Sequence, residues 1–242
     1  MALIMSLISQ NLQAVHEAIA LSATRYGRNP TEIALLAVSK TFGPEQVLEA
    51  WQAGQRAFGE NYLQEGVDKI AAVKDLLANQ AADEQPVWHF IGPIQSNKTR
   101  PIAEHFSWVH SVDREKIASR LSEQRPPELG PLNICLQVNV SGEASKSGVQ
   151  PTEVLALAKQ VMLLPNLRLR GLMSVPEASE DEAVQRQAFR QLADLQQQLQ
   201  SEGFVLDTLS MGMSADMPAA IAEGSTLVRI GSAIFGKRHY AV

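Results

Sequence analysis

The feature that most constrains this chain is a repeated alternation of short apolar, β-branched runs with longer amphipathic segments. Such alternation is typical of βα units arranged around a parallel sheet. The apolar runs predict eight strands, at 33–39, 56–60, 87–92, 107–112, 132–140, 167–173, 206–211 and 226–231. A (β/α)8 TIM barrel commonly takes about 250 residues, and this chain has 242. We therefore expect an α/β fold of the TIM-barrel type.

The segments between the strands are predicted to be helical. They cover 44–54, 61–79, 96–106, 113–124, 151–164, 181–202 and 216–223, and an extra helix at 5–26 precedes the first strand. Little sequence follows the eighth strand, so we expect the N-terminal helix to close the ring of helices. No G-x-G-x-x-G turn follows the first strand, which argues against an open, doubly wound sheet. The polar and Pro-rich breaks are loop-sized, so residues 1–242 are predicted to form a single domain.

Composition narrows the classes of function. The chain is 45% hydrophobic and 19% charged, with a formal net charge of −5 and no dense Lys/Arg run, which argues against a nucleic-acid-binding surface. The only cysteine, Cys135, lies in an apolar run and is interpreted as a core thiol. The N-terminus resembles neither a signal peptide nor a membrane span. We expect a cytoplasmic protein, a monomer, whose ligand is a small molecule.

In this barrel type the functional side chains gather where the strands end. Lys40 follows the first strand, so its amine is predicted to lie at the mouth of the barrel. Partial burial would lower the pKa of that amine and free a nucleophile able to condense with an aldehyde. The alternative is a lysine that extends its ammonium group into solvent from a strand end.

A second pattern follows strands seven and eight. LSMGMSADM carries Gly212 and Ser214, and VRIGSAIFG carries Gly231 and Ser232. Loops at these two positions often bind phosphate in this fold, with glycine N–H groups and serine hydroxyls as donors. Small residues that only permit tight turns are the alternative. Because strands one and eight are neighbours in a barrel, the pattern predicts an aldehyde at one end of the ligand and a phosphate at the other.

Six sequence strings together resemble a known family. They are AVSKTFGPEQV, FGENYLQEGVDK, WHFIGPIQSNK, GLMSVP, LSMGMSADM and VRIGSAIFG, between residues 37 and 236. This combination resembles the YggS family of pyridoxal 5'-phosphate (PLP) homeostasis proteins, also called the PROSC family, and covers nearly the whole chain. The resemblance implies an alanine racemase N-terminal-type barrel that holds PLP.

The resemblance also implies roles for individual residues. Lys40 matches the lysine that forms the Schiff base, and Arg229 matches the arginine that faces the pyridine nitrogen of PLP. The remaining implied contacts are Ser214, Gly231 and Ser232 at the phosphate and Asn61, Met173 and Met213 along the cofactor. A guanidinium has five donors and no acceptor, so Arg229 would bond only to an unprotonated ring nitrogen. Such a ring is a weaker electron sink, which suits cofactor storage or racemisation better than transamination.

Other candidates are interpreted more plainly. Lys146 is a possible secondary PLP acceptor or an ordinary loop lysine, and Lys98 is interpreted as a first-turn helix residue. His89 is interpreted as a hydrogen-bonded core residue, with a place near the ligand as the alternative. The five histidines form no H-E-x-x-H motif or Cys/His cluster, so no metal site is expected.

Three functions remain open at this point. The leading hypothesis is a carrier that binds PLP reversibly on Lys40, takes part in PLP homeostasis and delivers the cofactor to apo-enzymes without efficient catalysis. A PLP-dependent amino-acid racemase is the first alternative, but it needs an opposing proton donor and the chain has only three tyrosines. A cofactor-free Schiff-base aldolase or lyase is the second.

Overall fold

The eight predicted strands form a closed parallel barrel. A computed structural model of the protein describes residues 6–81, 84–141 and 147–237. The strands are β1 (Ala34–Val38), β2 (Ala57–Glu60), β3 (Val87–Phe90), β4 (Trp108–Val112), β5 (Leu132–Gln137), β6 (Leu167–Met173), β7 (Thr208–Ser210) and β8 (Leu227–Ile230). Each pairs with the next in parallel, and β1 pairs with β8 to close the ring. The prediction of a TIM barrel is confirmed.

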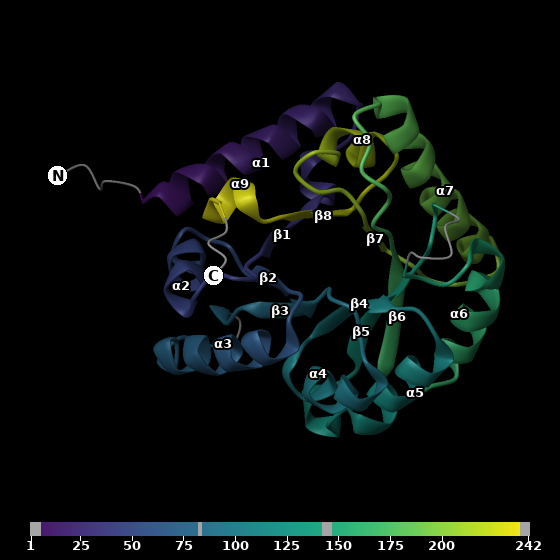
Figure 1. Ribbon diagram of the computed structural model, residues 1–242, viewed down its shortest axis with the longest axis horizontal. Helices are drawn as coiled ribbons and strands as arrows, with labels where there is room; N and C mark the ends of the chain where they lie inside the picture. The colour runs from purple at the N-terminus through teal and green to yellow at the C-terminus, as the bar shows by residue number, and fades with distance from the viewer. Residues whose placement is uncertain (1–5, 82–83, 142–146, 238–242) are drawn as a thin grey trace.

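Helices surround the barrel, as Figure 1 shows. They are α1 (Leu7–Arg25), α2 (Pro44–Gln52), α3 (Leu63–Leu76), α4 (Thr99–His105), α5 (Glu115–Gln124), α6 (Val154–Met162), α7 (Glu182–Ser201), α8 (Met217–Ala222) and α9 (Ser232–Phe235). Short 3-10 turns accompany them, including η3 (Ser96–Lys98) immediately before α4. The predicted helix at 96–106 therefore begins as a 3-10 turn and becomes α-helical only at Thr99.

The N-terminal helix closes the ring, as expected from the short sequence after the last strand. α1 packs against α2, α8 and α9, so it fills the position between the last and first βα units (Figure 1). Its buried residues are Ile8, Leu12, Val15, Ile19 and Ala23. They recur at the helical spacing of three to four residues that produces one apolar face. The four-residue α9 was not predicted, because so short a segment has no readable periodicity.

The strands are hydrophobic on both faces, as is usual where helices cover a parallel sheet. In β1, for example, Leu35, Leu36, Ala37 and Val38 are all buried. Several strands are shorter than predicted, since the apolar runs at 87–92, 132–140 and 206–211 continue beyond the paired residues. The run after β3 continues into a loop at the mouth, where Ile91 borders the candidate site. No helix in the described part of the chain is long and apolar enough to cross a membrane.

Candidate functional site

The ends of β1, β2, β7 and β8 surround a cavity of about 370 Å³ at the mouth of the barrel. Small-molecule sites typically measure about 300–1,000 Å³, so the space suits a compact ligand. Its lining residues are Val38, Lys40, Asn61, Ile91, Val175, Met213, Ser214, Ala215, Arg229, Gly231 and Ser232. Amine, amide, guanidinium, hydroxyl and apolar groups therefore border one space.

Lys40 enters this cavity from the end of β1. Val38 and Lys40 are two residues apart, and alternating side chains of an extended segment place both on the same side. The Lys40 side chain is half-buried. Thr41 then turns the chain with a φ of 70°, which an L-residue with a β-branched side chain rarely adopts. The chain therefore changes direction immediately after the lysine.

A buried ion cluster holds the residues on both sides of Lys40. Glu60 Oε1 accepts a hydrogen bond from Ser39 Oγ at 2.6 Å and from Lys69 Nζ at 2.7 Å. Lys69 Nζ also donates to the Ser39 carbonyl at 2.8 Å and to Glu65 Oε1 at 2.9 Å. Glu65 Oε1 in turn accepts from the Thr41 N–H at 2.6 Å. Burial raises the pKa of Glu60, and Lys69 opposes that rise.

The opposite side of the cavity is formed by the loops after β7 and β8. Ser214 and Ala215 come from the first loop, where Asp216 Oδ1 accepts a hydrogen bond from the Met213 N–H at 2.6 Å. Gly231 and Ser232 come from the second loop, at the start of α9. A Cβ on Gly231 would lie 3.1 Å from the Val38 carbonyl oxygen, so glycine keeps this loop close to β1.

Arg229 forms the buried floor beneath these loops. It is 4% exposed, and its Nη1 donates to the Ser210 carbonyl at 2.6 Å and to Ser210 Oγ at 2.8 Å. Its Nη2 donates to the Ser174 carbonyl at 2.8 Å. Burial lowers the pKa of Arg229 to about 10, and the nearby Asp216 opposes that shift. The guanidinium therefore remains charged at neutral pH.

Comparison with known proteins identifies the family. Residues 10–239 match the alanine racemase N-terminal domain. The chain is 57% identical over 234 residues to the pyridoxal phosphate homeostasis protein of Vibrio cholerae, covering 97% of this chain and 98% of the relative. It is 59% identical over 236 residues to the protein of the same name from Pseudomonas aeruginosa, covering 98% of each. The chain belongs to the pyridoxal phosphate homeostasis protein family.

Solved structures agree with this assignment. The structure of PipY from Synechococcus elongatus PCC7942 with PLP bound has a TM-score of 0.80 and 33% sequence identity, and the match covers 95% of this chain and 100% of PipY. An alanine racemase from Corynebacterium glutamicum has a TM-score of 0.67 at 14% identity, covering 97% of this chain and 61% of the racemase. The racemase likeness concerns the fold alone. The family resemblance inferred from the sequence strings is confirmed.

Seven of the eight residues expected in the homeostasis-protein site lie around one cavity. These are Lys40, Asn61, Met213, Ser214, Arg229, Gly231 and Ser232. Met173, which is buried at the end of β6, is not among the residues that line it. Val175 lines the cavity instead, because the chain continues beyond β6 and the residue two positions on reaches the mouth. Lys146 lies outside the described residues.

Nothing in the sequence indicates that some of the lining residues belong to the site. Val38, Ile91 and Ala215 are apolar or small and look like ordinary strand or loop residues. The alternation of side chains through Lys40 identifies Val38 in retrospect. The hydrogen bonds and ion pairs of Glu60 and Lys69 were also not predicted, although both residues lie in the FGENYLQEGVDK string.

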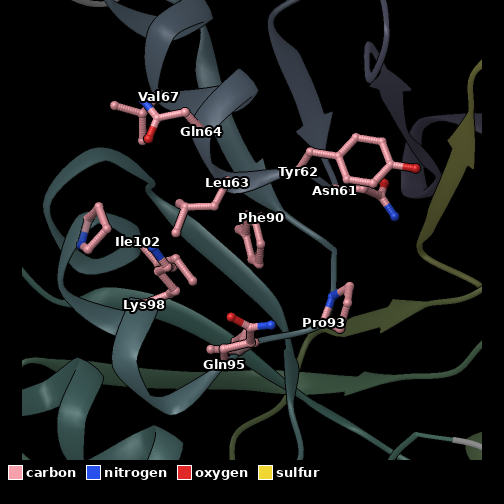
Figure 2. Close-up of a pocket in the computed structure, with 12 residues that line it drawn as sticks. Asn61, Tyr62, Leu63, Gln64, Val67, Phe90, Pro93, Gln95, Lys98 and Ile102 are labelled. Atoms are coloured by element: carbon pink, nitrogen blue, oxygen red, sulfur yellow. The ribbon is translucent and has the colours of Figure 1, made fainter. Parts of the chain in front are cut away.

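A second cavity, of about 430 Å³, adjoins the site through Asn61 (Figure 2). Leu63, Phe90 and Ile102 form part of its apolar lining, and Asn61 and Tyr62 point together away from Leu63 and Ile102. Lys98 lies here, exposed at the end of η3, and not at the Lys40 cavity. Among the described residues there is no cluster of three or more His, Cys, Asp or Glu side chains placed to hold a metal ion.

Proposed function

We propose that this protein binds PLP reversibly as a Schiff base on Lys40 and works as a cytoplasmic carrier in PLP homeostasis, delivering the cofactor to apo-enzymes without efficient catalysis. One observation carries the proposal: a single cavity is bordered by an amine, a buried guanidinium and a small-residue loop pair. PLP combines an aldehyde, a pyridine nitrogen and a phosphate, and each has a chemical counterpart among these groups. Family membership and the PLP-bound relative PipY support the same assignment.

The residues present suit the cofactor. Asn61 Oδ1 is buried and has no hydrogen-bond partner within the described residues, so it is available to a ligand donor. PLP supplies an aldehyde carbon that condenses with an amine. The chain's own residues would hold it: Lys40 at the aldehyde, Arg229 at the ring nitrogen, and Ser214, Gly231 and Ser232 at the phosphate. Val38, Ile91, Val175 and Met213 would exclude water from the ring.

The carrier hypothesis is favoured over a racemase because racemisation needs a proton donor on each face of the ligand. Within the described residues, Tyr26 donates its hydroxyl to Glu182 at 3.0 Å. Tyr62 lines the second cavity, and neither tyrosine lines the cavity of Lys40. Tyr240 lies outside the described residues. Lys40 is then the single amine or phenol of the described chain at the cavity, which suits storage and release.

The visible absorption spectrum tests the proposal. Wild-type protein mixed with PLP should gain a visible band that borohydride reduction removes while fixing the cofactor to Lys40. Lys40→Ala should lose at least nine-tenths of the band, and Lys98→Ala should keep it. Mass spectrometry of the reduced protein locates the modified lysine. A band that persists in Lys40→Ala and maps to Lys146 or another lysine would contradict the assignment, and robust amino-acid racemisation would contradict the non-catalytic role.

A further inference from the structure

A row of polar side chains crosses the interior of the barrel beneath the cavity. His89 of β3, His110 of β4, Ser210 of β7 and Arg229 of β8 follow one another, with exposed fractions of 0–4%. His89 Nδ1 lies 2.8 Å from His110 Nε2, and His110 Nδ1 lies 2.7 Å from Ser210 Oγ. Ser210 Oγ lies 2.8 Å from Arg229 Nη1. TIM-barrel interiors are mostly packed with branched apolar residues, so this row needs a reason.

The hydrogen positions in the row follow from Arg229. A guanidinium only donates, so Ser210 Oγ accepts from Arg229 Nη1. Among the other contacts of Ser210 Oγ in the described chain, His110 Nδ1 is the acceptor available to the hydroxyl proton, and we assign the proton to that bond. His110 then carries its hydrogen on Nε2 and donates it to His89 Nδ1, so His89 carries its hydrogen on Nε2. This network assigns the Nε2–H tautomer to both histidines.

Both histidines are also neutral. Burial lowers the pKa of His89 to about 3. Burial lowers the pKa of His110 well below its ordinary value, and His89 and Arg229 lower it further. At the far end of the row, the His89 ring stacks on Trp108 with the centroids 5.2 Å apart and the planes at 9°. The three uncharged members of the row, His89, His110 and Ser210, therefore support one cation, Arg229.

These contacts leave some of the hydrogen-bond donors of Arg229 available to a ligand. Both Nη1 hydrogens are used by Ser210, and one Nη2 hydrogen is used by the Ser174 carbonyl. The Nε hydrogen and the second Nη2 hydrogen have no hydrogen-bond acceptor within the described residues. Because a guanidinium is planar, the three bonds to Ser210 and Ser174 fix its plane. Arg229 also lines the cavity, so an acceptor there can use the remaining donors.

We propose that Ser210, His110 and His89 are positioning residues that hold Arg229 as a donor toward the ring nitrogen of the aromatic ligand in this cavity. The inference rests on the proposed function, because PLP supplies that nitrogen. His110 Nδ1 accepts the Ser210 hydroxyl proton, which turns the lone pairs of Ser210 Oγ toward Arg229 Nη1. Ser210, His110 and His89 thereby favour an unprotonated ring nitrogen through Arg229, without contacting the ligand themselves.

A pair of serine variants tests this role. Ser210→Ala removes the hydroxyl that links Arg229 to His110. Ser225→Ala is a matched control, because Ser225 is also fully buried and donates its hydroxyl to main-chain carbonyls around β7 and β8, at 2.7 Å for Met211. Both variants should lose stability to urea. PLP affinity, measured by titration of the visible band, should fall about tenfold in Ser210→Ala, stay within about twofold of wild type in Ser225→Ala, and recover in Ser210→Thr.

Nuclear magnetic resonance of the protein without PLP gives a second readout. The ring nitrogens of His89 and His110 should both report neutral Nε2–H tautomers at pH 7, and the Arg229 guanidinium hydrogens should exchange slowly. Slow exchange should be lost in Ser210→Ala and kept in Ser225→Ala. Equal PLP affinity in the two alanine variants, or an Nδ1–H tautomer at His110, would overturn the inference. Loss of PLP binding by wild type with these signals intact would overturn only the proposed function.

Discussion

Two lysines, Lys40 and Lys69, lie close to the end of β1, and their different surroundings give them different roles. Lys69 uses all three ammonium hydrogens, on the Ser39 carbonyl, Glu60 Oε1 and Glu65 Oε1. An amine bound in this way has no free lone pair and cannot attack a carbonyl. Lys40 extends instead into the cavity. The ion cluster thus supports the segment that carries the nucleophile while keeping its own amine unreactive.

This cluster gives a prediction for stability. Glu60 and Lys69 are 0% and 4% exposed, so replacing Glu60 breaks a buried ion pair and leaves the Lys69 ammonium with only the partly exposed Glu65 as a carboxylate partner. Glu60→Leu should lower the free energy of unfolding by about 3–5 kcal/mol. The double variant Glu60→Leu with Lys69→Met should recover part of that loss, because the buried ammonium that lost Glu60 is then also removed. Urea unfolding measures both, and a double variant no more stable than the single one would contradict the account.

Sequence reasoning reached only part of this arrangement. Glu65 and Lys69 are readable as an i,i+4 pair on a helix, and the structure contains that ion pair. The bond from Lys69 to the Ser39 carbonyl joins residues 30 positions apart. No local pattern predicts such a contact, because it depends on how α3 packs against the ends of β1 and β2. The polar row through His110 and Ser210, 100 positions apart, was missed for the same reason.

At the scale of elements, the number and order of strands were predictable because each apolar run is bounded by turn residues. The ends of the strands were less predictable, because hydrophobicity indicates that a residue is buried and not that it pairs with a neighbouring strand. The run at 87–92 continues to Gly92, but β3 ends at Phe90 and Ile91 lines the cavity. Met173 shows that a correctly predicted strand end does not by itself identify the residue at the cavity. Its strand ends as predicted, yet the residue at the cavity is two positions further on.

α1 provides a prediction at this scale, because it packs against α2, α8 and α9 and closes the ring of helices. Ile19 is 3% exposed on the face that meets its neighbours, and Leu21, on the same helix, is 74% exposed. Ile19→Ala should cost about 2–5 kcal/mol of unfolding free energy through lost burial and a cavity. Leu21→Ala should change it by no more than about 0.5 kcal/mol. Similar urea midpoints for the two variants would contradict a stabilising role for the packing of α1 against its neighbours.

For the whole molecule, the two core histidines couple stability to pH. Their folded-state pKa values lie below the ordinary 6.5, at about 3 for His89 and well below 6.5 for His110. Below pH 6.5 the unfolded chain binds protons at these positions and the folded chain does not, so acid favours unfolding. Their contribution is complete above pH 6.5 and is lost as the pH falls from there.

The size of this effect is large for a domain that is stable by about 5–15 kcal/mol. The slope from each histidine approaches about 1.4 kcal/mol per pH unit below 6.5, so the pair should remove about 3 kcal/mol between pH 6.5 and 5. Urea unfolding in a pH series measures the slope. The exposed His16 serves as the control: His16→Gln should leave the slope unchanged, whereas the double variant His89→Gln with His110→Gln should be less stable at pH 7 but flatten the slope. An equally steep slope in that double variant would place the acid sensitivity elsewhere in the molecule.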